Sequence, residues 1–151
     1  MDKFNFDKII KNLERTKKTL PLKLANETKN YFLSAFDKQA WDGQKWKEVN
    51  RRISGTKEYK RATQSERTRN ILIGKGSGKL RPAVNKSLKE YTFEKIRFVV
   101  SGIDYAAIHN YGLPMKNGKL MPKRTYMGDT KELRAKQLDL IKRNIGGIWN
   151  G

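Results

Sequence analysis

Apolar residues change their spacing twice along the chain, and this pattern limits the fold more than any other feature of the sequence. Up to about residue 40 they recur every three or four positions, which is typical of amphipathic helices. Residues 50–82 have almost no apolar periodicity, and from residue 83 the period falls to two, which is typical of strands. The sequence therefore predicts an α+β fold: N-terminal helices, a small mainly antiparallel sheet, a short helix, a hairpin and a C-terminal helix.

The N-terminal region is expected to form two helices. Residues 6–13 carry apolar side chains at three- and four-residue steps. Residues 17–21 interrupt this pattern, and Pro21 is acceptable in the first turn of a second helix. Paired apolar positions between residues 24 and 36 form one stripe on that second helix.

Two tryptophans, Trp41 and Trp46, flank the dipeptide Asp42-Gly43, which predicts a turn. We expect the tryptophans to anchor the core, and the alternative is that they stack on a ligand.

Two strands that form a hairpin are expected after residue 83. Val84 and Leu88 alternate with polar neighbours in the first strand, and Ile96, Phe98 and Val100 alternate in the second.

Two shorter signals follow the strands. Residues 104–111 predict a short helix that is capped by Asp104 and stopped by Gly112. The dipeptide Asn117-Gly118 is a strong signal for a hairpin.

The last element is expected to be a helix over residues 130–145. Asp129 and Glu132 have the spacing of a capping-box variant, and Gly146-Gly147 should stop the helix. Trp149 would then lie in a frayed tail.

Basic residues outnumber acidic residues by 34 to 15 among 151 residues, which gives a formal net charge of +19. Such an excess repels itself in a compact chain, so it implies either a polyanionic partner or a need for solubility. Much of it falls in residues 50–82, where we expect a mobile basic loop within a single domain that spans residues 1–151. This loop is either functional or merely solvated. Its candidate contacts with DNA or with a partner are Arg51, Arg52, Lys57, Lys60, Arg61, Arg67 and Arg69.

Composition excludes several classes of function. The chain has no cysteine and one histidine, so thiol catalysis, cysteine-ligated zinc, iron–sulfur clusters and histidine-rich metal sites are not expected. No apolar stretch approaches the length of a bilayer span, and the N-terminus does not resemble a signal peptide, so the chain is expected in the cytoplasm. No metal or other cofactor is expected.

The sequence evidence for catalytic groups is also weak. The glycine-rich segment from Gly74 to Leu80 has the wrong spacing for a phosphate-binding loop. His109 has no serine nucleophile motif beside it, so a structural role is favoured over that of a general base. Asp129, Glu132 and Asp139 are spread along the last helix. We therefore predict no catalytic residue and no enzyme.

Nucleic-acid binding fits the composition better than the order of residues. Basic side chains interleave with Tyr59, Tyr91, Phe93 and Tyr126, which could stack bases. The sequence has no zinc-finger spacing, no aromatic strand motif of RNA-binding domains and no clear helix-turn-helix. Contact with DNA that does not depend on base sequence therefore stays open.

Five motifs follow one another in the second half of the chain. They are Gly78-Lys79-Leu80-Arg81, then Ser87, then the strand that ends at Val100, then Tyr105-Ala106-Ala107-Ile108-His109-Asn110-Tyr111-Gly112, and finally Pro122-Lys123-Arg124. Their order and spacing resemble the phage virion morphogenesis family, the tail-completion proteins of Mu-like phages and prophages. In that family the serine lies on a strand. The helical N-terminus and the turn from Trp41 to Trp46 are similar too, so the resemblance spans most of the chain.

The resemblance implies a structural role in virion assembly, as a tail-completion protein or head–tail connector without a catalytic step. Its partners would be other phage tail or neck proteins and further copies of itself, for example in a ring around a DNA channel. It would act in the host bacterial cytoplasm during assembly and remain in the virion, in the tail or neck. The alternative is a small basic protein that binds nucleic acid without sequence preference. Within the motifs, Tyr105, His109 and Arg124 are expected to form a packing and hydrogen-bonding cluster, which is favoured over direct contact with a partner.

Overall fold

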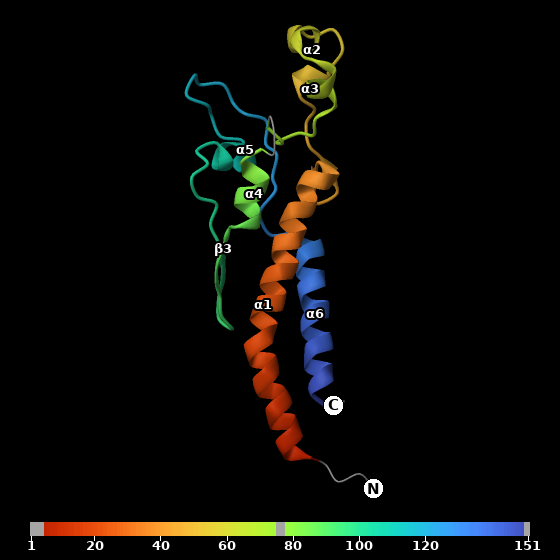
Figure 1. Ribbon diagram of the computed structural model, residues 1–151, viewed down its shortest axis with the longest axis vertical. Coiled ribbons are helices and arrows are strands. Elements are labelled where there is room, and N and C mark those ends of the chain that lie inside the picture. Colours follow the sequence, from red (N-terminus) through yellow and green to blue (C-terminus); the bar gives the residue numbers. More distant parts are fainter. Residues whose placement is uncertain (1–4, 75–77, 150–151) are drawn as a thin grey trace. The chain divides into compact units, whose positions relative to one another are not determined.

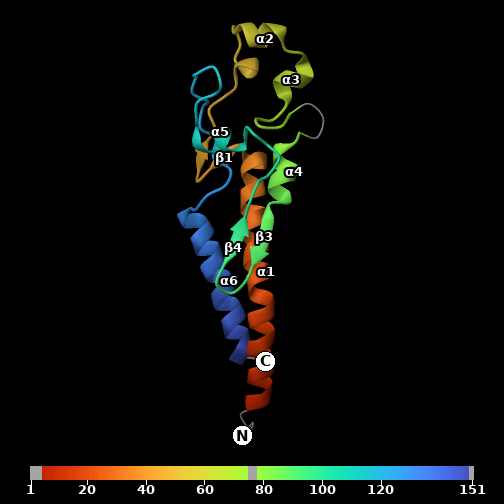
Figure 2. The ribbon, with the colours of Figure 1, turned by 90° about the vertical axis from the view of Figure 1, so that its left-hand side faces the viewer.

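A computed structural model describes residues 5–74 and 78–149 of the chain (Figures 1 and 2). The fold is α+β, as predicted, with helices and two separate antiparallel sheets of two strands each in the described residues. The chain divides into two compact units. The first is built from the described residues of 1–31, 88–99 and 129–151, and the second from those of 32–87 and 100–128. The single domain over residues 1–151 stays a prediction.

The N-terminal region forms one helix, α1 (Phe6–Lys38), and the expectation of two helices was wrong. Pro21 lies inside α1, although proline removes one backbone donor and disfavours a helix interior. Leu20, Ala25 and Thr28, on either side of the proline, are all buried in the first unit. Packing of this continuous stripe outweighs the local cost of the proline, because tertiary contacts supply most of the stability of a helix in a protein.

Helix α6 (Lys131–Trp149) runs beside α1 in both views (Figures 1 and 2). Gln137 Nε2 donates to Thr28 Oγ1 at 2.8 Å and Lys23 Nζ donates to Asn144 Oδ1 at 2.6 Å, so polar contacts join the two helices within the first unit. The helix continues through Gly146-Gly147, contrary to the expected stop. Its last turn buries Ile148, which accounts for the continuation.

Thr130, and not Asp129, caps the start of α6. The Thr130 hydroxyl oxygen accepts a hydrogen bond from the backbone N–H of Leu133 at 3.0 Å, which is the geometry of an N-cap. Asp129 instead forms an ion pair with Arg134. The predicted helix is therefore present, but the predicted capping pair of Asp129 and Glu132 was wrong.

The predicted hairpin of two strands is confirmed as β3 (Leu88–Tyr91) and β4 (Ile96–Phe98) in the first unit. Leu88 pairs with Phe98, and the register shifts between Leu88 and Glu90. Val84 does not belong to the first strand, because it lies in the helix α4 (Leu80–Asn85) and is fully buried there.

The core of the second unit is aromatic. The ring of Phe36 lies 5.8 Å from that of Trp46 and 5.3 Å from that of Tyr126, and all three side chains are buried. Trp46 Nε1 donates to the carbonyl oxygen of Thr125 at 2.8 Å, and the hydroxyl of Tyr126 donates to the carbonyl oxygen of Ala106 at 2.9 Å. Burial raises the pKa of Tyr126 to about 12, so its hydroxyl keeps the proton that it donates. Trp46 is a core anchor, as expected.

The turn at Asp42-Gly43 is confirmed. It joins β1 (Ala40–Trp41) to β2 (Gln44–Lys45), which pair as antiparallel strands. Asp42 and Gly43 both have positive φ, at 49° and 76°, which a tight hairpin turn of this kind requires.

Residues 50–82 are not a plain loop. They form η1 (Asn50–Arg52), α2 (Lys57–Arg61), α3 (Gln64–Thr68) and the start of α4, with residues 75–77 outside the described part of the chain. Thr56 caps α2, and Thr63 forms a capping box with Glu66 at the start of α3. These caps satisfy backbone donors locally, which is how short helices form without an apolar stripe. Mobility of the segment stays a prediction.

The short helix before Gly112 is confirmed as α5 (Ala106–Tyr111). Gly112 ends it with φ of 72°, and a Cβ atom there would lie 3.0 Å from Lys123 Cβ, so this position requires glycine. The residue at the N-cap is Tyr105 and not Asp104, and no side chain caps the helix. The turn at Asn117-Gly118 is also confirmed, since Met115 N–H donates to Lys119 O at 2.8 Å and a bridge joins Pro114 to Leu120.

Candidate functional site

The basic residues predicted to contact DNA or a partner fall into two groups in the structure. Those on α2 have exposed side chains: Lys57, Lys60 and Arg61. The others are half-buried: Arg51, Arg52, Arg67 and Arg69. The structure therefore does not bring the seven residues together as one exposed surface.

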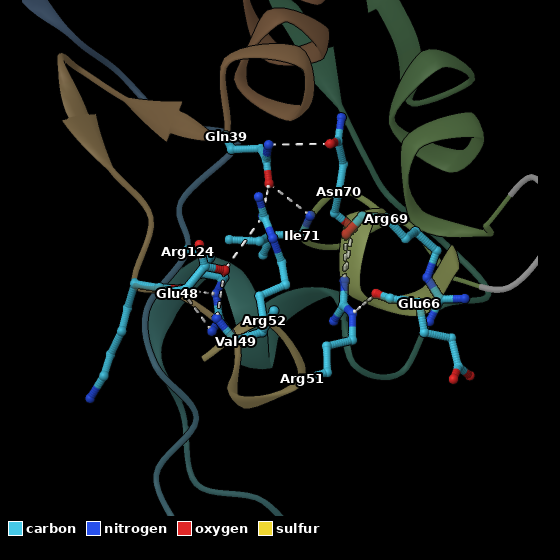
Figure 3. Close-up of polar contacts among 11 residues, drawn as sticks. Gln39, Glu48, Val49, Arg51, Arg52, Glu66, Arg69, Asn70, Ile71 and Arg124 are labelled. Atoms are coloured by element: carbon cyan, nitrogen blue, oxygen red, sulfur yellow. Dashed lines mark hydrogen bonds and ion pairs between the residues drawn. The ribbon is translucent and has the colours of Figure 1, made fainter. Parts of the chain in front are cut away.

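Arg51 is folded against its own segment (Figure 3). Its Nε–H donates to the carbonyl oxygen of Glu66 at 2.8 Å, and its Nη2 group donates to the carbonyl oxygens of Arg69 at 2.8 Å and Asn70 at 3.2 Å. Burial lowers the pKa of Arg51, and the charge of Arg69 lowers it further. Arg51 thus joins η1 to the end of α3 through backbone acceptors.

Gln39 is, like Arg51, a junction, by which we mean a side chain that joins separate segments through hydrogen bonds (Figure 3). This role was not predicted from the sequence. It has a positive φ of 50°, and its Oε1 accepts hydrogen bonds from Arg52 Nη1 at 3.0 Å and from the backbone N–H of Ile71 at 3.0 Å. Its Nε2 donates to Asn70 Oδ1 at 3.2 Å. A polar residue just after a helix end carries no periodicity signal, so only the fold identifies this role.

Arg67 packs on Tyr59. Its guanidinium carbon lies 4.1 Å from the ring centroid, and its Nε and Nη2 donate to the carbonyl oxygen of Tyr59 at 3.1 and 2.8 Å. This arrangement combines a cation–π contact with two hydrogen bonds, so Arg67 ties α3 to α2.

Arg124, at the end of the last family motif, is buried and forms hydrogen bonds with two other segments of the chain. Its backbone N–H donates to the carbonyl oxygen of His109 at 2.8 Å. Its Nε and Nη2 groups donate to the carbonyl oxygen of Lys47 at 3.1 and 3.0 Å (Figure 3). Burial lowers the pKa of Arg124, and the nearby charge of Arg51 lowers it further.

His109 packs beside Arg124 and Tyr105. The rings of Tyr105 and His109 meet edge to face at 5.7 Å. Burial lowers the pKa of His109 below 6.5, and the charge of Arg124 adds to this effect. The Nδ1 atom of His109 is buried and has no hydrogen-bond partner among the described residues.

The other motif positions are explained by backbone conformation, by burial or by hydrogen bonds within the chain. Gly78 has a positive φ of 62°, and Leu80 is buried in the core. Arg81 Nη2 donates to both carboxylate oxygens of Asp37 at 3.2 Å. Ser87 is fully buried, and its hydroxyl donates to the carbonyl oxygen of Val84 at 2.7 Å. The resemblance had implied that this serine lies on a strand, and this was wrong, because Ser87 precedes β3.

The remaining motif residues belong to α5 and the segment after it. Ala106 is buried, and the carbonyl oxygen of Ile108 accepts from the backbone N–H of Gly112 at 2.9 Å. Pro122 is half-buried.

Asn110 is the residue of this motif that sequence reasoning did not single out. It is buried, and its Oδ1 accepts from the backbone N–H groups of Tyr126 at 2.9 Å and Met127 at 3.0 Å. Its Nδ2 donates to the carbonyl oxygen of Met127 at 3.0 Å. These bonds mimic a strand pairing and fix residues 125–127 against α5. The sequence signal that could have indicated this role is an amide side chain on an otherwise apolar helical face.

A hollow of about 290 Å³ lies in the second unit. We call it the arginine hollow, because Arg51, Arg69 and Arg124 line it together with His109 and Tyr105. Its apolar wall comes from the residues Val49, Ile71, Leu72 and Ile73, and Gly74 completes it. Among the described residues that line it, none is acidic.

A larger groove of about 700 Å³ lies in the first unit. We call it the apolar groove. Helix α1 contributes Ile9, Leu13, Leu20 and Leu24, the β3–β4 hairpin contributes Phe93 and Ile96, and α6 contributes Ile141, Ile145, Ile148 and Trp149. Phe93 and Trp149 are each 64% exposed, which is unusual for large apolar side chains that lie together.

The described residues hold neither a metal-binding cluster nor a helix that could span a membrane. They contain no group of three or more histidine, aspartate or glutamate side chains that could hold a metal ion. Over the same part of the chain, none of the helices is both long and apolar enough to cross a membrane.

Comparison with known families identifies the class of protein. A model of the phage virion morphogenesis family matches residues 4–146. Because this match covers nearly the whole chain, the chain belongs to that family, as the motifs indicated, and its role is structural, in virion assembly. No curated protein and no solved structure matches the chain. The closer relation to Mu-like phages stays a prediction.

Proposed function

We propose that the protein completes the tail or joins it to the head, by associating with copies of itself and contacting other virion proteins. The family supports a structural role in virion assembly. The observation that carries the proposal is the apolar groove, since large apolar side chains that lie together and stay exposed are typical of a protein interface. The protein would act in the bacterial cytoplasm during assembly and then remain in the tail or neck.

The occupant that we propose for the groove is a second copy of the chain. Phe6 and Ile10 of α1 lie outside the groove and are 68% and 54% exposed, so the same molecule carries both a groove and an apolar helix end. An interface between two different surfaces of one chain is heterologous, and it closes into a ring when the rotation between copies allows. This is the symmetry that a channel for DNA needs.

Charge makes this association depend on salt in a characteristic way. Two copies with a formal net charge of +19 each repel one another, and salt screens that repulsion. Apolar contacts do not weaken as salt rises. Self-association through the groove should therefore be stronger at high salt, whereas binding to nucleic acid weakens steeply with salt.

Light scattering of nuclease-treated protein tests the proposal. We expect a defined oligomer whose share rises with protein concentration and with salt. Phe93→Glu places a charge in the groove and should return the protein to a monomer. Leu120→Glu is the matched control, because Leu120 is 73% exposed and lies outside the groove. A wild-type protein that is monomeric at every concentration and salt would contradict self-association through this groove.

The alternative function is binding to nucleic acid without sequence preference. The observation that favours it is the exposed basic face of α2, with Lys57, Lys60 and Arg61. If this is the function, affinity for DNA should fall steeply between about 50 and 200 mM salt, and charge removal at all three positions should reduce the slope. Binding that is unchanged by the triple substitution would remove α2 from this hypothesis.

A further inference from the structure

We propose that the arginine hollow binds one tetrahedral oxyanion of the phosphate type. This inference goes beyond virion assembly and does not depend on it, since a free monomer could bind the ion. The residues that line the hollow include three arginines and one histidine, and no acidic residue among the described ones. Its volume of about 290 Å³ lies at the lower end of the range for ligand pockets and leaves room for a small ion.

The charges in the hollow oppose one another in the absence of an anion. Arg69 lowers the pKa of Arg51, Arg51 lowers that of Arg124, and Arg124 lowers that of His109. Glu48 offsets part of this charge, because it raises the pKa of both Arg51 and Arg124, and Glu66 also raises the pKa of Arg51, but neither glutamate lines the hollow. An anion between these groups would relieve the remaining repulsion.

Two buried nitrogen atoms of residues that line the hollow have no hydrogen-bond partner among the described residues: Arg69 Nε and His109 Nδ1. Buried donors without partners are rare in folded proteins, and each such group calls for an explanation. Arg51 and Arg124 give their Nε and Nη2 donors to backbone carbonyl oxygens, which holds their guanidinium groups in place. Arg69 and His109 are therefore the residues whose hydrogen-bonding capacity is available to a ligand. The fixed guanidinium groups of Arg51 and Arg124 add positive charge beside them.

The shape of the ion follows from the arrangement of donors. The candidate donors come from two segments: Arg69 from the residue after α3 and His109 from α5. Donors from two separate segments suit a tetrahedral ion with four oxygens better than a planar carboxylate, which two parallel donors of one guanidinium satisfy. Free phosphate and the phosphate of a nucleic-acid backbone share this chemistry.

His109 makes the proposal testable at one atom, because it is the only histidine of the chain. In a protein without an affinity tag, its imidazole gives a single NMR titration curve. We would measure the pKa of His109 in chloride, sulfate, inorganic phosphate and acetate at matched ionic strength. Sulfate keeps its charge across the titration and serves as the reference ion. An oligothymidylate forms a further arm and supplies backbone phosphate.

A bound dianion should raise the pKa of His109 by about one unit, because an opposite charge nearby favours the protonated ring. Sulfate and phosphate should produce this shift and acetate should not. A shift in oligothymidylate as well would identify nucleic acid as a source of the phosphate group, and its absence would identify the free ion. A pKa that is the same in all ions would overturn the proposal, and an equal shift in acetate would overturn the tetrahedral preference.

Arg69→Gln removes one charge of the hollow and keeps a polar side chain of similar reach. It should reduce the affinity for sulfate at least fivefold, as read from the same His109 signal. Arg61→Gln is the matched control, because Arg61 is exposed on α2 and does not line the hollow. Equal affinities in the two variants would contradict the assignment to the hollow. If Arg69→Gln does not fold, the comparison of ions on the wild-type protein decides the proposal alone.

Discussion

The backbone N–H of Arg124 donates to the carbonyl oxygen of His109 at 2.8 Å, so two family motifs that are separate in the sequence meet directly in the second unit. The guanidinium of Arg124 then reaches a third place in the chain, the carbonyl oxygen of Lys47. This geometry agrees with the expectation that Tyr105, His109 and Arg124 form a packing and hydrogen-bonding cluster, and it explains the motifs by folding before any contact with a partner is invoked.

Arg124→Met should lower the free energy of unfolding by about 1.5–3 kcal/mol, because it removes hydrogen bonds from a charged donor and leaves the Lys47 carbonyl oxygen without them. Urea denaturation measures this change. Lys123→Met is the control, since Lys123 is exposed next to it. Equal stability of the two variants would show that Arg124 acts in binding and not in folding.

Asn110→Ala should cost about 2–3 kcal/mol of stability, because the backbone N–H groups of Tyr126 and Met127 lose their acceptor in a buried place. Asn85→Ala, at an exposed position at the end of α4, should change stability far less. The same denaturation experiment compares them. A similar loss in both variants would contradict the role assigned to Asn110.

Stability should depend on pH through His109. Its pKa is lower in the folded protein than the ordinary value of 6.5, because burial and then Arg124 disfavour the charged ring. The unfolded chain therefore binds the proton more readily, so this contribution is fully present above pH 6.5 and is lost as the pH falls through the folded pKa.

Denaturation of the wild-type protein and of His109→Gln in chloride buffer, at steps between about pH 7.5 and 5, measures this dependence. The wild type should lose more stability than the variant over that interval. Parallel curves would mean that His109 is not desolvated in the folded state.

Gly112→Ala should destabilise the protein more than Gly102→Ala does. Both positions have positive φ, at 72° and 71°, so both substitutions cost about 1–2 kcal/mol of backbone strain. Only at Gly112 would the new methyl group lie 3.0 Å from Lys123 Cβ, whereas nothing lies within 4 Å at Gly102. The extra cost should be about 1 kcal/mol or more, and thermal or urea unfolding of the pair checks it. Equal losses would mean that Lys123 moves aside freely.

Local signals predicted a large part of the fold. The turns at Asp42-Gly43 and Asn117-Gly118, the end of α5 at Gly112 and the β3–β4 hairpin depend on backbone conformations or alternation that a few neighbouring residues specify. The errors lie where packing overrode a local preference, as at Pro21 inside α1 and at Gly146-Gly147 inside α6. In both cases buried neighbours favour a continuous helix.

The predicted contact residues were chosen by charge, and charge alone does not say where a side chain points. Arg51 and Arg67 turned out to bind backbone carbonyl oxygens within their own unit, and Arg52 binds the side-chain oxygen of Gln39 there. A guanidinium carries several donors, which can satisfy acceptors that a segment without an apolar stripe leaves open. Lys57, Lys60 and Arg61 are exposed, as the predicted contact with DNA or a partner requires.

The sequence by itself determined the α+β class, the positions of the turns, the excess of positive charge and the family, because each depends on residue types and on spacing along one chain. Only the tertiary structure decided that Asn110 and Gln39 are junctions, and that Arg51, Arg69, Arg124 and His109 line one hollow. It likewise placed the tip of the β3–β4 hairpin with α1 and α6 around the apolar groove. These features join residues from distant parts of the chain, and such contacts form only when burial of the core brings those parts together.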